Sequence, residues 1–298
     1  MVEQIVPDPG TDIQQAVEIL GGEIDSSEEI TGLRAPGKLR VCFRLRLKDG
    51  RTVKGRRFAS TEKRETFTAL CPALDGLPFS RLLAAYGTAA IEEWVPGIPV
   101  ELDDLADGAI GDLATVLGHL NRRPIPCEAS TAKIRGVNWH ANRLTNLLAE
   151  LTQKEHLNSA FATKIIDLAS DNRPPDFECG VIHTDFHPQN MVLREQHEIW
   201  TIDNEGLRIG VLDFDIARCW RRWPMTREQR EVFRQAYGYF RCLDSFLAHQ
   251  KFWSISTLVL TARINERHGR PIQGYLNTLA QIVQNEDDAL WPQHSPND

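Results

Sequence analysis

The chain has 298 residues, of which 42% are hydrophobic and 25% charged, and its formal net charge is −7. This is the composition of a globular protein that can bury a core, and it excludes disordered, collagen-like and coiled-coil chains. No apolar run is long enough to span a membrane, and the first residues lack the basic and apolar regions of a secretory signal, so we expect a cytoplasmic protein. The six cysteines include no Cys-x-x-Cys pair, which argues against a disulfide framework and a structural zinc site.

The N-terminal part has a β pattern. Apolar and basic residues alternate up to Asp49-Gly50, which predicts a β-hairpin over residues 39–58. A two-residue turn would place Lys54 and Arg56 on the apolar face of this hairpin. Residues 38–66 hold eleven Lys/Arg and three Asp/Glu but no clear aromatic platform, so we interpret them as a solvated basic face and expect no nucleic-acid or membrane partner.

The pattern changes from strands to helices near residue 95. Before it, Ser60 or Thr61 is predicted to cap a helix that ends at Leu70, and a further strand follows. After it, apolar residues recur at three- and four-residue spacing, and Thr226 with Gln229 predicts a capped helix toward Leu247. The remaining predictions are a strand at 89–95, helices at 101–121, 137–154 and 159–170, and short strands at 181–182, 191–193, 199–202 and 207–212. We therefore expect an α+β protein with a β-rich domain over residues 1–94 and a mainly helical domain over residues 95–298.

The short strands surround a segment with unusual chemistry, His-Thr-Asp-Phe-His-Pro-Gln-Asn at residues 183–190. In a kinase catalytic loop an Asp accepts the proton of the attacking hydroxyl, and an Asn five residues later helps to hold magnesium. Asp185 and Asn190 have this spacing. A second metal ligand should be an Asp that closes a later strand, and both Asp203 and Asp213 qualify. We favour Asp213, because it ends an apolar run whereas Asp203 opens a turn-like segment.

These motifs resemble those of the aminoglycoside phosphotransferase and choline kinase group, small-molecule kinases of the protein-kinase-like fold. The loop of that group commonly reads His-Gly-Asp-x-His-Pro-x-Asn, matched at residues 183–190 except that Thr184 replaces Gly, and its later Gly-x-Ile-Asp motif resembles residues 210–217. The resemblance implies a two-lobed fold with a small β-rich N-lobe and a larger, mainly helical C-lobe. It also implies Asp213 as a metal ligand, and Asp215 as a second acid that approaches metal or braces the loop.

The resemblance extends to the nucleotide site. Glu93, Trp94 and Val95 lie where the hinge of the group offers backbone groups to adenine. A phosphate-binding cation is expected on the third strand, where we favour Lys54 or Arg56 over Arg57. Its acidic partner should lie on the next helix, at Glu65 or Glu62. The segment around Gly32 and Gly37 is a poor match to a glycine-rich phosphate loop.

Together these features predict a kinase that uses ATP, or another nucleoside triphosphate, and Mg²⁺ to phosphorylate a hydroxyl of a small molecule. An antibiotic, amino alcohol, sugar, amino acid and biosynthetic intermediate all remain open as acceptor. Asp185 would be the catalytic base, with His183 and His187 as structural supports of the loop.

Other interpretations exist for the same residues. The weak glycine segment also fits a catalytically degenerate kinase fold that only binds a nucleotide or small molecule. His183, Asp185 and His187 would form the metal site of a hydrolase if they alternated on a strand, but Pro188 argues against that strand. Arg221 and Arg222, flanked by Trp220 and Trp223, could contact an anionic or aromatic substrate, although we favour a role in covering apolar surface at a helix end.

Overall fold

The computed structural model describes residues 9–31, 41–101, 105–129, 134–194, 198–286 and 290. Two compact units divide the chain: the first comprises Met1–Val100, Ile125–Ala132 and Asn190–Arg208, and the second comprises Glu101–Pro124, Lys133–Gln189 and Ile209–Asp298. The first unit is built on an antiparallel sheet and the second is mainly helical, which confirms the predicted α+β class. The first unit extends beyond the predicted boundary at residue 94 and contains two later segments of the chain. The segment around residue 200 belongs to it because its strands pair within this unit.

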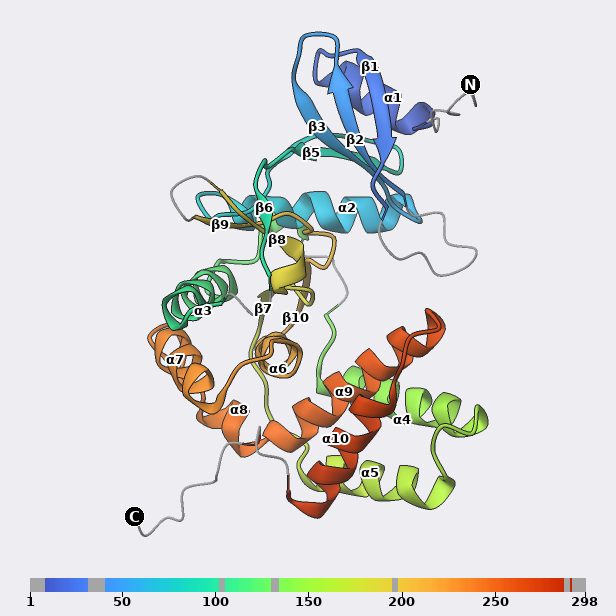
Figure 1. Cartoon of the computed structure of the whole chain (residues 1–298), viewed down its shortest axis with the longest axis vertical. Helices are drawn as coiled ribbons and strands as arrows, with labels where there is room; N and C mark the ends of the chain where they lie inside the picture. Colours follow the sequence, from blue (N-terminus) through green and yellow to red (C-terminus); the bar gives the residue numbers. More distant parts are fainter. Residues whose placement is uncertain are drawn as a thin grey trace. The chain divides into compact units, whose positions relative to one another are not determined.

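The first unit contains a five-stranded sheet in the order β1-β2-β3-β5-β4 (Figure 1). A second, three-stranded sheet has the order β6-β8-β9. The elements are α1 (Thr11–Ile19), β1 (Ile24–Glu29), β2 (Val41–Leu47), β3 (Thr52–Arg57), α2 (Thr61–Leu70), β4 (Leu82–Tyr86), β5 (Ala89–Glu93), β6 (Ile98–Pro99), β8 (Met191–Leu193) and β9 (Ile199–Thr201), with 3-10 turns at Cys71–Leu74 and Cys127–Ala129. The Ser60 side chain accepts the N–H of Lys63 and caps α2, as predicted.

The β2–β3 hairpin forms where it is predicted, but the predicted register is wrong by one residue. Arg46 pairs with Thr52 and Leu45 with Val53, because the connection has three residues and not two. Gly50 adopts a φ of 88°, a left-handed conformation that closes such a longer turn and that side chains disfavour. Lys54 therefore lies opposite Arg44, on the face away from the apolar core, and Arg56 shares that face.

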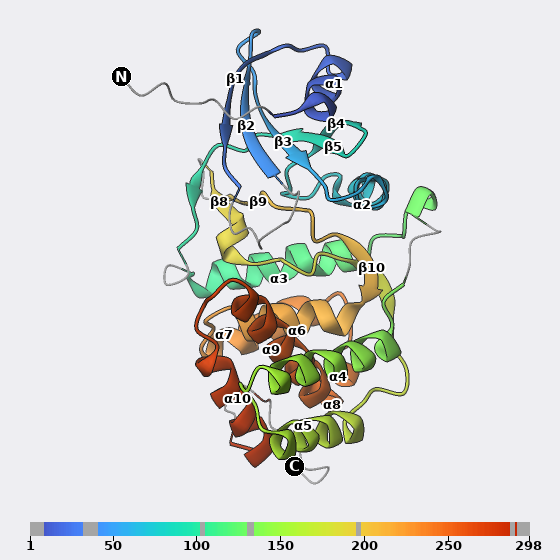
Figure 2. The same ribbon diagram turned by 90° about the vertical axis from the view of Figure 1, so that its right-hand side faces the viewer.

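The apolar face of the sheet packs against α1, which lies alongside the strands in Figure 2. Ile13 and Val17 of α1 join buried residues of β2, β3 and β5 in one core. Gly55 permits this close packing, since a Cβ there would lie 2.7 Å from Leu45 Cδ1 and 3.3 Å from Ile13 Cγ2. The opposite face is left for the charged residues that flank Gly55, Lys54 and Arg56.

The second unit consists of helices and one two-stranded sheet, β7 with β10. Its elements are α3 (Asp107–Asn121), α4 (Val137–Gln153), α5 (Ser159–Asp171), β7 (Cys179–Ile182), β10 (Arg208–Val211), α6 (Leu212–Arg222), α7 (Arg227–Gly238), α8 (Asp244–Ala248), α9 (Gln250–Arg267) and α10 (Gln273–Gln284). A 3-10 turn at Pro188–Asn190 precedes β8.

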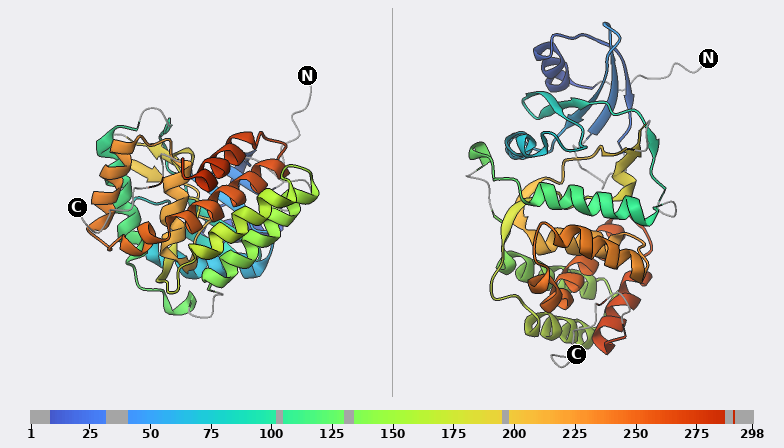
Figure 3. Two further views of the ribbon diagram at one scale, coloured as in Figure 1. Left: turned by 90° about the horizontal axis from the view of Figure 1, so that it is seen from below. Right: turned by 90° about the vertical axis from the view of Figure 1, so that its left-hand side faces the viewer.

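Helix α9 organises the second unit. It packs against α4, α5, α6 and α10, and Figure 3 shows these helices side by side in the left-hand view. Accordingly, residues 252–263 of α9 are buried on all sides of the helix. The predicted capping box is present at Thr226 and Gln229, although α7 ends at Gly238 rather than near Leu247. No helix in the described ranges is long and apolar enough to cross a membrane.

Candidate functional site

In the first unit, Arg56 is the centre of a buried charged cluster. Its guanidinium has no exposed surface and binds three carboxylates: Nε lies 2.9 Å from Glu92 Oε1, Nη2 lies 2.6 Å from Asp203 Oδ1, and Nη1 lies 2.7 Å from Glu205 Oε2. Burial by itself would lower the pKa of Arg56, but the charges of Asp203 and Glu92 raise this pKa well above its ordinary value. The guanidinium is therefore a permanent cation that fixes the three carboxylates.

Asp203 also faces the second cation of this strand. Lys54 Nζ donates a hydrogen bond to the carbonyl of Ile202 at 2.5 Å and lies 4.0 Å from Asp203 Oδ1. Asn204 anchors the same segment to Ser80, since its Nδ2 donates to the carbonyl of Ser80 at 2.9 Å and to Ser80 Oγ at 3.0 Å. Asp203 is thus a well-supported carboxylate directed at Lys54 and Arg56, with 24% of its side chain exposed.

The acidic partner of the cation on β3 does not lie on the helix that follows β3, where it is predicted. Glu65 is 62% exposed and lies 3.4 Å from Arg64, whereas the buried partner of Arg56 is Glu92 on β5. The sequence carried a signal for Glu92, because it directly follows the apolar run Ala89-Ala90-Ile91 of a strand, and an acid buried there requires a cation. Among the described residues, neither Glu65 nor Glu62 pairs with Lys54 or Arg56.

The predicted hinge residues follow β5 directly. Glu93 pairs with Arg81 at 2.9 Å, the Arg44 guanidinium lies over the Trp94 ring at 4.9 Å, and Val95 is buried. Their contact with adenine stays a prediction. The segment that contains Gly32 and Gly37 lies outside the described residues.

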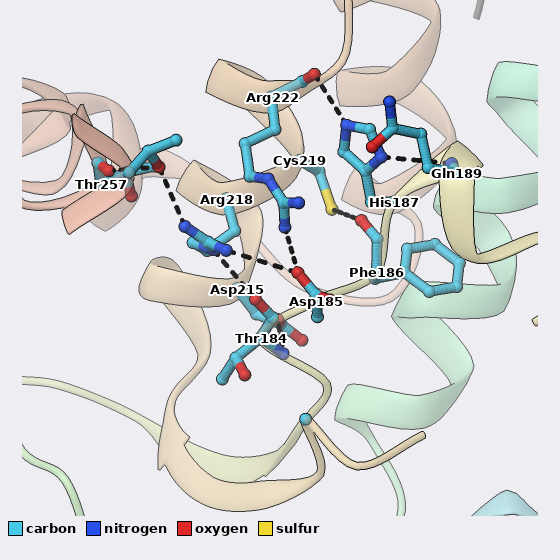
Figure 4. Close-up of polar contacts among 12 residues, drawn as sticks. Thr184, Asp185, Phe186, His187, Gln189, Asp215, Arg218, Cys219, Arg222 and Thr257 are labelled. Carbon is cyan, nitrogen blue, oxygen red and sulfur yellow. Dashed lines mark hydrogen bonds and ion pairs between the residues drawn. The ribbon is translucent and has the colours of Figure 1, made fainter. Parts of the chain in front are cut away.

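In the second unit, the loop that follows β7 presents Asp185 (Figure 4). Asp215 braces this loop from the first turn of α6: its Oδ2 accepts the N–H of His183 at 2.9 Å and its Oδ1 accepts the N–H of Thr184 at 2.8 Å. Thr184, which replaces the Gly of the motif, adopts a φ of 55°. A β-branched residue is strained in this left-handed region, so the loop holds a conformation for which glycine is the usual residue.

The support of the loop by the two histidines stays a prediction, whereas the premise of the hydrolase alternative, a strand through residues 183–187, is wrong. His183 is completely buried, and His187 Nδ1 accepts the N–H of Gln189 while Nε2 donates to the carbonyl of Arg222 at 3.1 Å. Burial, followed by the charge of Arg222, lowers the pKa of His187 to about 4. Because β7 ends at Ile182, these residues do not alternate on a strand. In the part of the chain that the structure describes, no three His, Cys, Asp or Glu residues form a metal-binding group.

Asp185 itself lies next to two arginines of α6. Arg222 Nη1 donates to Asp185 Oδ1, and Arg218 Nη2 lies 3.5 Å from the same oxygen (Figure 4). The Asp185 side chain is 38% exposed, so it is accessible to an acceptor. The sequence prediction treated Arg222, together with Arg221, as cover for apolar surface and did not consider Arg218. It missed this pairing, because only the helical spacing of residues 218 and 222 hints that they share a face.

Asp213 occupies a different environment from the predicted one. It lies in the first turn of α6 rather than at an open strand end, it is completely buried, and its Oδ1 binds Arg241 Nη1 at 2.5 Å. Glu178 pairs with the same arginine. The environments of the two candidate aspartates are therefore the reverse of those predicted. Asp203 lies beside the phosphate-binding candidates Lys54 and Arg56, and Asp213 is buried within the second unit.

Comparisons with known proteins identify the family of the chain. The model of the phosphotransferase enzyme family matches residues 44–249, which is more than half of the chain. A search of the curated proteins found no significant match.

Solved structures of similar fold include several small-molecule kinases. A putative fructosamine-3-kinase from Thermobifida fusca has a TM-score of 0.65 at 13% identity, over 94% of this chain and 99% of that one. Spectinomycin phosphotransferase in complex with ADP and spectinomycin has a TM-score of 0.63 at 11% identity, over 95% and 99% of the two chains. Ethanolamine kinase from Plasmodium vivax has a TM-score of 0.60 at 12% identity, over 88% and 82%. With the family match over most of its length, the chain belongs to the phosphotransferase enzyme family and is a small-molecule kinase.

Proposed function

We propose that this protein transfers the γ-phosphate of ATP to a hydroxyl group of a small molecule, with Mg²⁺ as the required ion. The observation that carries the proposal is the cluster of Lys54, Arg56 and Asp203 in the first unit, which combines cations for phosphate with a carboxylate for metal. The spectinomycin phosphotransferase of similar fold holds ADP, which supports ATP as the phosphate donor.

Asn190 and Asp203 are the residues that would hold the metal. Their side chains offer amide and carboxylate oxygens, the donors that Mg²⁺ prefers. The backbone brings them together, since the N–H of Ile202, next to Asp203, donates to the carbonyl of Asn190 at 2.9 Å. We assign this role to Asp203 in place of Asp213, whose carboxylate is enclosed against Arg241. Bound there, the ion would neutralise charge on the phosphates.

Lys54 is the better candidate for direct contact with phosphate. The Arg56 guanidinium already binds three carboxylates, which leaves it the role of positioning Asp203. Among the residues that the structure describes, Lys54 is held by a carbonyl and a longer ion pair to Asp203, so its ammonium can turn to a phosphate oxygen at small cost.

Asp185 would act on the acceptor. Its carboxylate would orient the hydroxyl and take its proton as the oxygen attacks phosphorus, while the bond to the leaving ADP oxygen breaks. Asp215 contributes by holding the backbone of His183 and Thr184, which fixes the position of the Asp185 loop.

Ligand-induced stabilisation tests the nucleotide half of the proposal. A ligand at 100 times its dissociation constant adds about 2.7 kcal/mol to the stability of the native state. Mg-ATP should therefore raise the melting temperature of the wild type and of Asp213→Asn, each relative to its own ligand-free form, but not of Asp203→Asn. Loss of the shift in Asp213→Asn with retention in Asp203→Asn would contradict the assignment.

Turnover tests the catalytic half. Asp185→Asn should retain the Mg-ATP shift and lose phosphate transfer in a screen of hydroxyl acceptors. The alternative of a non-catalytic binder finds support in one observation, the engagement of Asp185 by Arg222. A wild type that binds Mg-ATP and transfers phosphate to no acceptor would favour that alternative.

A further inference from the structure

The arginines around Asp185 are more numerous than its charge requires. Arg218 and Arg222 both approach Asp185 Oδ1, so one catalytic carboxylate faces two guanidinium groups. Asp215 is a further acid whose charge acts on Arg218, and its oxygens accept the N–H groups of His183 and Thr184 and the side-chain amide of Asn121 at 3.3 Å. The surroundings of the base are therefore cationic once these contacts are satisfied.

The two arginines differ in how firmly their guanidinium groups are held. Arg218 is 7% exposed and is held by the carbonyl of Thr184 at 2.9 Å and by Thr261 Oγ1 at 3.1 Å. Arg222 is 20% exposed, and among the described residues Asp185 is the one side chain that its guanidinium binds. Arg218 is thus a fixed cation, and Arg222 is the one that can exchange its partner.

A second pair of arginines lies at α4, in the same unit: Arg135 precedes this helix and Arg143 lies within it. Arg135 and Arg143 stack on the ring of Trp139 at 4.6 and 4.8 Å, and among the described residues no carboxylate pairs with either. Burial, followed by the charge of Arg135, lowers the pKa of Arg143 to about 10. This group adjoins the start of α6, since the His140 ring lies 4.3 Å from that of Phe214. The second unit therefore carries further positive charge near the start of α6, whereas Arg222 lies at the end of this helix.

We propose that the acceptor is an anionic hydroxy compound, carrying a carboxylate or a phosphate group, and that Arg222 binds this group. When the anion binds, Arg222 leaves Asp185 for it, and the freed Asp185 oxygen can accept the hydroxyl proton. The O–H proton goes to Asp185, the acceptor oxygen bonds to the γ-phosphorus, and ADP departs with the electrons of the broken P–O bond. A cationic acceptor would meet the arginines with the same sign of charge and leave Asp185 paired.

This inference rests on the proposed kinase activity, and an acceptor screen tests it directly. The screen would measure ADP release with three sets of hydroxyl compounds: hydroxy acids, sugar acids and sugar phosphates; neutral sugars and polyols; amino alcohols and aminoglycosides. The best acceptor should come from the anionic set, with carboxylates and phosphates distinguished inside it. A best acceptor from the neutral or cationic set would overturn the proposal and leave the kinase activity intact.

Variants separate substrate recognition from a merely structural role. Arg222→Gln should raise KM for the anionic acceptor by about 10- to 100-fold, the effect of one charge-assisted hydrogen bond, and Arg222→Lys should restore part of it. The Mg-ATP shift should be unchanged. An Arg222 that only positions Asp185 would instead lower kcat for all acceptors, with KM unchanged, and this result would refute the proposal.

A binding measurement decides the matter if no acceptor is turned over. Sodium sulfate would be titrated against wild type, Arg222→Gln and the exposed control Arg270→Gln, and melting temperatures compared with sodium chloride at equal ionic strength. The general stabilisation by sulfate is common to all three proteins, so only differences count. Extra stabilisation of wild type and Arg270→Gln, absent from Arg222→Gln, supports an anion site at Arg222. Equal responses of all three refute it, whether or not Mg-ATP binds.

Discussion

The pair between Asp213 and Arg241 makes Asp213→Asn a test of stability rather than of metal binding. Asp213 is completely buried and the Arg241 side chain is 11% exposed, so the substitution leaves a cation largely out of water. Removal of one partner of a buried ion pair costs about 3–5 kcal/mol. The Asn oxygen can still accept a hydrogen bond, and Glu178 still pairs with Arg241, so we expect about 3 kcal/mol, at the lower end of that range.

Unfolding followed by circular dichroism would measure this loss. At about 2–4 °C per kcal/mol for a protein of this size class, the melting temperature of ligand-free Asp213→Asn should fall by about 6–12 °C. The matched control is Asp167→Asn, because Asp167 is an exposed acid of α5 in the same unit, and it should change little. A loss for Asp213→Asn no larger than that of the control would refute the buried pairing and restore Asp213 as a candidate metal ligand.

Three further predictions concern other charged groups. Burial and Arg222 lower the pKa of His187 to about 4, below its ordinary value of about 6.5. Neutral His187 therefore stabilises the fold fully above pH 6.5, and this contribution is lost as the pH falls toward 4. Urea unfolding at several pH values should show that His187→Gln removes this part of the acid sensitivity, whereas an unchanged pH profile would contradict the prediction. Arg56→Met leaves Glu92 buried without its cation and should cost about 3–5 kcal/mol in urea unfolding, and the double variant Arg56→Met/Glu92→Leu should be less destabilised than the single one if the burial of Glu92 is the cause. Glu65→Gln should leave the Mg-ATP shift at the wild-type value, because Glu65 is exposed; a lost shift would return it to the nucleotide site.

The sequence by itself determined the features that depend on local chemistry. The spacing of Asp185 and Asn190 predicted a kinase catalytic loop, and the family match confirms the kinase class. The caps at Ser60 and Thr226 marked the starts of α2 and α7, since a side-chain oxygen there satisfies free backbone N–H groups within three residues. Local hydrogen bonds and periodicity carry such features, and they need no distant partner.

Tertiary structure decided what depends on distant partners. The register of β2 and β3 follows from a three-residue connection, and an Asp-Gly pair is compatible with turns of two or three residues. The choice between Asp203 and Asp213 depends on Arg56 and Arg241, which lie far from them in sequence. Composition near each aspartate could not reveal this, because the environment of a carboxylate is set by the charges and burial that folding brings to it. The contact of Arg222 with Asp185 depends in the same way on the packing of α6 against the loop that follows β7.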